Sequence, residues 1–80
     1  MNKDELDHKK FLEEQLEWCK KQDRIFGGID MKLSEMKKIA EYALQHELTS
    51  AEIEDLNVQL SELKNEVDSL EKQLHSSVVH

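Results

Sequence analysis

The sequence predicts an all-α fold, either a helical hairpin or a small three-helix bundle, with a coiled-coil C-terminal helix and an oligomeric assembly. The chain contains no proline and only two glycines, so few positions interrupt a helix. Charged residues make up 36% of the 80 residues and hydrophobic residues 38%, with many Leu, Glu, Lys and Gln. Apolar residues recur at helical spacing along three segments. We therefore expect a single helical domain over residues 1–80.

The first segment is predicted to be a helix over residues 4–26. Its apolar residues form adjacent pairs at seven-residue intervals, Phe11-Leu12, Trp18-Cys19 and Ile25-Phe26. This spacing returns to the same helix face every second turn and indicates one broad apolar stripe. Gly27 and Gly28 follow, and glycine adopts the left-handed conformation that closes many helices. The pair predicts the end of this helix and a bend.

The second segment is predicted to be a helix over residues 30–48, with Asp30 as its N-cap. Its apolar residues recur at steps of one to four, namely Leu33, Met36, Ala40, Ala43 and Leu44. The two alanines are small enough to allow a neighbouring helix to approach closely.

The third segment, over residues 50–76, has the clearest pattern. Its apolar positions alternate steps of three and four: Ile53, Leu56, Leu60, Leu63, Val67, Leu70 and Leu74. This alternation over about three heptads is typical of a coiled-coil seam. Residues 77–80 are expected to form a frayed tail.

Two signals mark the start of the third segment. Thr49 and Glu52 have the spacing of a capping box, and Leu48 and Ile53 have the spacing of a hydrophobic staple. These signals predict a new helix at Thr49 and an antiparallel hairpin of the second and third segments. No glycine or proline separates the two segments, so one continuous helix over residues 30–76 is the alternative.

The leucine seam needs a helix to pack against, because so small a core barely offsets the entropy of ordering the chain. In a parallel homodimer Glu66 would face Glu71 of the second copy, and this like-charge pair disfavours that arrangement. An antiparallel pairing, or packing against the first two segments, fits better. We expect packing within the chain together with formation of a homodimer or higher oligomer; the alternative is a monomeric bundle.

The charge balance excludes several classes of function. The net charge is -7, and residues 49–80 carry seven acidic and two basic side chains. Direct nucleic-acid binding is disfavoured, because it requires clustered cations. No apolar run approaches the ~20 residues that span a bilayer, and the first residues are polar. With a single cysteine, the sequence predicts a cytoplasmic protein without membrane contact.

Histidine and cysteine, which commonly bind metals or act in catalysis, are present, but they lack the spacing that such sites require. His8, His46, His75 and His80 have no further ligand at a known metal spacing. Cys19 lies near three cations that would activate an exposed thiol, but the spacing identifies no histidine or carboxylate to orient it. We expect Cys19 to be a small buried residue. The sequence predicts no metal, no cofactor and no enzymatic activity.

The predicted function is that of a small regulator that binds a protein partner through its leucine-rich seam. Trp18 serves either to dock the first segment or as the energetic centre of a partner interface. The candidate interface residues are Phe11, Trp18, Phe26, Leu56, Leu60, Leu63, Val67 and Leu70.

An alternative function uses the acidic residues of the third segment. The candidate acidic face consists of Glu52, Asp55, Glu62, Glu66 and Glu71. Carboxylates at turn-sized intervals imitate a phosphate backbone, so this face would occupy the basic groove of a nucleic-acid-binding protein. The protein would then be an inhibitor of the kind found among small phage proteins.

A second alternative comes from the residues around the predicted turn. The stretch Leu48-Thr49-Ser50-x-Glu52-Ile53, followed by Leu60 and Leu63, resembles the Spo0E-type aspartyl-phosphate phosphatases of spore-forming bacteria, which are two-helix hairpins. The resemblance implies a hairpin that dephosphorylates response regulators. Ser61 stands where the family has its functional acidic residue and Glu47 where it has a turn glycine. Gln59 is the only stand-in, so the resemblance provides no phosphatase site.

Overall fold

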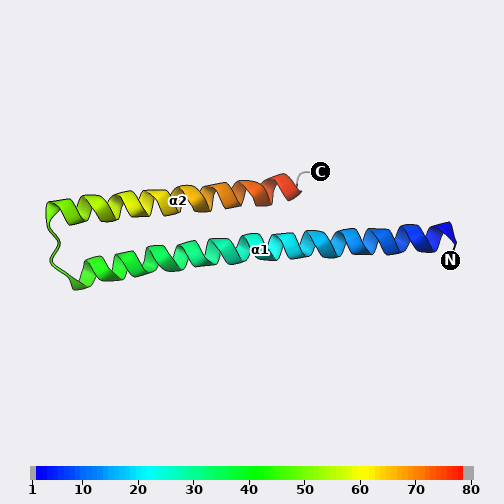
Figure 1. The fold of residues 1–80 in the computed structure, drawn as a ribbon, viewed down its shortest axis with the longest axis horizontal. Helices are drawn as coiled ribbons and strands as arrows, with labels where there is room; N and C mark the ends of the chain where they lie inside the picture. Colours follow the sequence, from blue (N-terminus) through cyan, green and yellow to red (C-terminus); the bar gives the residue numbers. More distant parts are fainter. Residues whose placement is uncertain (1, 79–80) are drawn as a thin grey trace.

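A computed structural model describes residues 2–78, and the side chains of residues 2–75. The described chain is an antiparallel hairpin of two long helices, α1 (Lys3–Gln45) and α2 (Ser50–Val78) (Figure 1). The molecule is a rod of 70 × 20 × 11 Å. The described residues contain no strand. The all-helical class and the hairpin of the second and third segments are therefore confirmed.

The predicted bend at the two glycines is wrong, and with it the three-helix bundle. α1 runs without interruption through Gly27 and Gly28, and neither glycine is left-handed. Each glycine inside a helix costs about 1 kcal/mol relative to alanine, an amount that packing against a second helix can offset. Gly28 lies directly against α2, because a Cβ built there would come within 3.2 Å of Leu70 Cδ1. The first two predicted helices are thus one.

The predicted capping box forms at the start of α2. The Thr49 N–H donates to Glu52 Oε1 at 3.3 Å, and the Glu52 N–H donates to Thr49 Oγ1 at 3.2 Å. Two free backbone donors of the first turn are thereby satisfied. Residues 46–49 form the turn, so the alternative of one helix over residues 30–76 is wrong.

The other helix ends are also held locally. Asn2 Oδ1 accepts a hydrogen bond from the Glu5 N–H at 2.9 Å and caps α1. At the far end of α1, His46 Nδ1 donates to the Tyr42 carbonyl at 2.8 Å, and the two rings stack with centroids 4.0 Å apart. α2 remains helical to Val78, two residues past the predicted end, so the predicted frayed tail is wrong at residues 77 and 78. Residues 79 and 80 lie outside the described part.

The core is one narrow seam between the helices. Its centre contains Ile25, Leu63 and Val67, which are all less than a tenth exposed, beside the buried amide side chain of Gln22. The residues of α1 that are buried or half-buried at steps of three and four are Gln22, Ile25, Ile29, Lys32, Met36 and Ile39. This face differs from the predicted one, because Leu33 is 49% and Leu44 88% exposed. The charged Lys32 occupies a seam position, whereas the apolar Leu33 beside it is exposed. The apolar pattern therefore predicted a buried face that is rotated about the helix axis from the observed one.

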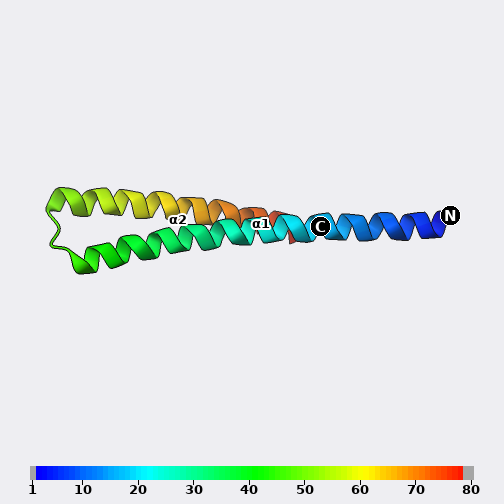
Figure 2. The same ribbon diagram turned by 60° about the horizontal axis from the view of Figure 1, so that its bottom comes forward.

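The two helices differ in length, and this difference leaves part of α1 uncovered. α1 has 43 residues and α2 has 29. At 1.5 Å per residue the difference is about 20 Å. Figure 1 shows the first part of α1 continuing past the end of α2, and Figure 2 shows the same extension after rotation. In both views the helices diverge towards the turn.

Candidate functional site

The leucine seam, which we expected to bind a partner, is used within the chain. Leu63 and Val67 are buried. Leu56, Leu60 and Leu70 are half-buried. A partner therefore cannot reach Leu63 and Val67 without opening the hairpin, and only part of each of the other three side chains is accessible. The available apolar surface lies elsewhere.

The three aromatic residues predicted as anchors are all at least two-fifths exposed. Phe11 is 55%, Trp18 41% and Phe26 54% exposed. Phe11 belongs to the part of α1 before Trp18, which we call the N-terminal extension (residues 3–17). Every side chain from residue 2 to residue 21 is exposed. Phe11 therefore does not dock the first segment onto α2.

A second apolar stripe lies beside the seam of α1. We call it the exposed edge; its members are exposed and spaced by seven residues, namely Leu12, Cys19, Phe26, Leu33 and Ala40. Each follows directly after a residue at the heptad position that makes the seam: Phe11, Trp18, Ile25, Lys32 or Ile39. α2 covers this seam position at Ile25, Lys32 and Ile39 but not at Phe11 and Trp18, and it leaves the exposed edge open. Cys19 is exposed, so its predicted burial is wrong.

The exposed edge is hollowed near the end of α2. Here Trp18, Cys19 and Phe26 of α1 meet Leu74 of α2 around a groove of about 320 Å³. Gln22 also lines this groove, and its Nε2 atom is buried without a hydrogen-bond partner among the described side chains. A buried amide donor without a partner is costly, so Gln22 lowers the stability of this end of the seam.

A second apolar groove, of about 290 Å³, lies near the turn, where the helices diverge. Ala40 of the exposed edge lines it together with Ile39, Leu48, Ile53 and Leu56. Leu48 and Ile53, the residues of the predicted hydrophobic staple, thus line the same apolar groove. The predicted close approach of a helix onto Ala40 does not occur in the hairpin, since Ala40 is exposed.

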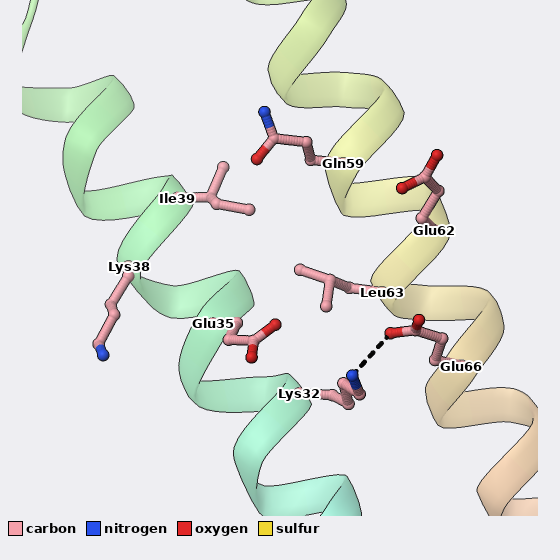
Figure 3. Close-up of a pocket in the computed structure, with 8 residues that line it drawn as sticks. All are labelled: Lys32, Glu35, Lys38, Ile39, Gln59, Glu62, Leu63 and Glu66. Atoms are coloured by element: carbon pink, nitrogen blue, oxygen red, sulfur yellow. Dashed lines mark ion pairs between the residues drawn. The ribbon is translucent and has the colours of Figure 1, made fainter.

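A third groove, between the middle parts of the helices, is polar (Figure 3). It is lined by Lys32, Glu35, Lys38, Ile39, Gln59, Glu62, Leu63 and Glu66. Lys32 Nζ reaches across from α1 to Glu66 Oε2 of α2 at 3.0 Å. The hydrogen bond and the negative charge of Glu66 raise the pKa of Lys32 above its ordinary value of 10.5, and partial desolvation opposes them. This ion pair joins the helices at one end of the groove (Figure 3).

The candidate acidic face is partly engaged within the chain. Glu52 takes part in the capping box, and Glu66 pairs with Lys32. Asp55 Oδ2 accepts a hydrogen bond from Gln59 Nε2 at 3.2 Å. Glu62 and Glu71 are exposed. Three of the five carboxylates therefore have structural contacts.

No chemistry-bearing cluster emerges in the described part of the chain. His46 holds the turn, His8 and His75 are exposed, and His80 lies outside the described residues. Among residues whose side chains are described, no three His, Cys, Asp or Glu form a group suited to a metal ion. Within the same part, neither helix contains a stretch long and apolar enough to cross a membrane.

Comparisons with protein-family models, with curated proteins and with solved structures gave no match. The geometry of the hairpin itself is therefore what indicates a function. Its most distinctive surface is the exposed edge with the N-terminal extension. The sequence carried the signal for this surface in the pairs Phe11-Leu12, Trp18-Cys19 and Ile25-Phe26. Two adjacent apolar residues in each heptad form a stripe that is wider than packing against a single helix requires.

Proposed function

We propose that the protein is a non-enzymatic interaction module, a small cytoplasmic regulator that binds a helix of a protein partner along its exposed edge. The observation that carries the proposal is the exposure of five apolar residues at seven-residue spacing, beside a seam that α2 fills from Gln22 to Ile39. A strict seven-residue apolar repeat is the spacing at which a second helix packs along the first. Contiguous exposed apolar surface commonly marks a binding site.

The aromatic residues strengthen this proposal. Trp18 and Phe26 line the groove at the end of α2, and Phe11 precedes it on the N-terminal extension. Large aromatic side chains contribute most of the binding energy in many interfaces, because they bury much area with few rotatable bonds. The cytoplasmic assignment is supported by the single cysteine of the sequence.

The test is capture of partners from a lysate of the native host by the immobilised protein, read by mass spectrometry. The double substitution Leu12→Ser and Phe26→Ser should abolish capture while leaving the helical circular-dichroism signal of the hairpin. Met31→Ser is the matched control, since Met31 is 66% exposed and lies on the face of α1 opposite Leu33. It should capture the same proteins as the wild type. Equal capture by the wild type and the edge variant would contradict the proposal.

A further inference from the structure

The turn between the helices contains no residue that requires a turn. Residues 46–49 include neither glycine nor proline, and no residue of the described chain has a positive φ. Each turn residue can therefore adopt the α conformation without strain. The turn is held by the capping box of Thr49 and Glu52 and by the hydrogen bond of His46 to Tyr42, all of them exposed. Its conformation thus depends on a few hydrogen bonds at the surface.

The seam keeps one seven-residue repeat on both sides of the turn. The members of this repeat are Ile25, Lys32 and Ile39 in α1, and Ile53, Leu60, Val67 and Leu74 in α2. All of them are buried or half-buried except Ile53, and the missing member between the helices is His46, in the turn itself. The companion seam residues, such as Met36 and Leu56, lie at adjacent heptad positions. A hairpin requires no such relation between its two helices, whereas a straight helix over both would present one nearly continuous apolar stripe.

The helices separate where the turn joins them. They diverge towards residues 46–49 in both views (Figures 1 and 2), and the apolar groove of about 290 Å³ opens there between Ile39 of α1 and Leu56 of α2. Ile53 remains 48% and Tyr42 44% exposed in this part of the molecule. Two helices that run straight past each other need no turn to span the distance between them. They can therefore stay in contact and fill the groove.

We infer that two copies of the chain exchange their α2 helices. Residues 46–49 become helical, and α1 of each copy packs against α2 of the other in the register of the hairpin. Domain swapping of this kind exchanges an identical element between copies, keeps the native contacts and is favoured where the hinge is short. The exposed edge takes no part in the exchange, which therefore holds or fails independently of the proposed function.

The hairpin itself shows that the exchanged surfaces fit each other. Gly28 lies against Leu70, and Lys32 pairs with Glu66. Each step of four residues along α1 is thus matched by a step of four residues back along α2. Continued through a straightened turn, this register places Thr49 beside Thr49 of the second copy. The two chains are then related by a two-fold axis at the former turn.

Cross-linking of an isotope mixture tests the exchange. Equal amounts of unlabelled and heavy-isotope-labelled chain are unfolded together in urea and refolded at micromolar and at submillimolar concentration. A carbodiimide then joins Lys32 Nζ to Glu66 Oε2, which lie 3.0 Å apart, and mass spectrometry identifies the joined peptides. The hairpin gives peptides that are wholly light or wholly heavy. Exchange should also give mixed peptides, up to half of the total at the higher concentration.

The pair of Lys9 with Glu13, 4.0 Å apart within α1, is the internal control and should give no mixed peptides at either concentration. Absence of mixed peptides for Lys32 and Glu66 at both concentrations would overturn the inference. An equal share of mixed peptides for the two pairs would indicate random collision and would overturn it as well.

Substitutions in the turn shift the balance between the two forms in opposite directions. His46 has φ −130° and ψ 145°, the conformation that a following proline favours. Glu47→Pro therefore fits the hairpin but breaks a straight helix, so it should remove the mixed peptides and leave the helical circular-dichroism signal. Glu47→Ala is the matched control and should retain them. Mixed peptides at the wild-type level in the proline variant would contradict the inference.

Thr49→Ala removes the capping box, which only the form with a turn contains. It should raise the share of mixed peptides several-fold after refolding at micromolar concentration, and an unchanged or lower share would contradict the inference. This variant decides the question if Glu47→Pro loses its helical signal.

The length of the particle distinguishes the exchanged pair from two hairpins side by side. The exchanged pair is about 140 Å long at 1.5 Å per residue, twice the 70 Å of the hairpin. Small-angle X-ray scattering of the dimer, which has twice the 9.4 kDa mass of one chain, measures this length. A dimer no longer than one hairpin would contradict the exchange.

Discussion

Two polar side chains, Gln22 and Lys32, occupy seam positions where apolar residues would pack more simply. Gln22 is 7% exposed, and its Nε2 atom lacks a partner among the described side chains. Lys32 extends its aliphatic stem along the seam and places its ammonium group on Glu66. Polar groups in a helix seam cost stability, yet they disfavour other registers, in which they would be buried without partners.

Lys32 gives the hairpin a dependence on high pH. Its pKa is raised in the folded hairpin, chiefly by the hydrogen bond to Glu66, and is ordinary in the unfolded chain. The stabilisation is therefore fully present below pH 10.5 and is lost as the pH rises through the folded-state pKa. The effect is small and falls with added salt, since the Lys32 side chain is 32% and the Glu66 side chain 51% exposed.

Urea unfolding at neutral pH and above pH 10.5 measures this dependence. Lys32→Met should lose less stability between the two conditions than the wild type, because the other titrating groups are common to both proteins. An identical pH dependence of the two proteins would show that the ion pair does not contribute.

At the scale of the element, the continuity of α1 through two glycines is the feature that most shapes the molecule. Gly27 has open space around the position of a Cβ, whereas Gly28 is in contact with Leu70. The contacted atom, Cδ1, lies at the end of the flexible Leu70 side chain, so this side chain can move slightly. Only Gly28 therefore has a packing role.

Alanine substitutions separate the two glycines. Gly27→Ala should raise the free energy of unfolding by about 1 kcal/mol, since it removes the entropy cost of glycine in a helix without a clash. Gly28→Ala should raise it by less or lower it, because the new methyl group crowds Leu70. Urea or thermal unfolding gives both values. A loss of stability on Gly27→Ala would indicate that α1 bends there in solution.

At the scale of the whole molecule, stability is concentrated in the middle of the seam. Leu63 is 8% exposed, while Leu44 is 88% exposed on the same hairpin. Loss of a buried leucine side chain costs ~2–5 kcal/mol, and loss of an exposed one usually less than about 0.5 kcal/mol. The rod shape leaves few other buried residues to compensate.

This contrast predicts that Leu63→Ala lowers the unfolding free energy by at least ~2 kcal/mol, whereas Leu44→Ala leaves it nearly unchanged. Circular dichroism during urea unfolding is the measurement. Equal effects of the two substitutions would mean that the hairpin seam does not hold the molecule together.

The sequence by itself determined the helical class, the capping box of Thr49 and Glu52 that starts α2, and the seam of α2. These features follow from local backbone chemistry and from a regular apolar repeat on one face, which do not depend on distant residues. The sequence placed the end of the preceding helix at residue 48, three residues beyond the observed end at Gln45. It also named three exposed aromatic residues, Phe11, Trp18 and Phe26, through apolar pairs at seven-residue intervals, and Phe26 belongs to the exposed edge.

Only the tertiary structure decided that α1 continues through Gly27 and Gly28, that Lys32 lies in the seam, and that the leucine seam is filled from within the chain. The physical reason is one of magnitude and of geometry. Two helical glycines cost only about 2 kcal/mol together, which contact with a second helix offsets. Where each heptad carries two adjacent apolar residues, only the position of α2 fixes which of the two is buried and which remains available to a partner.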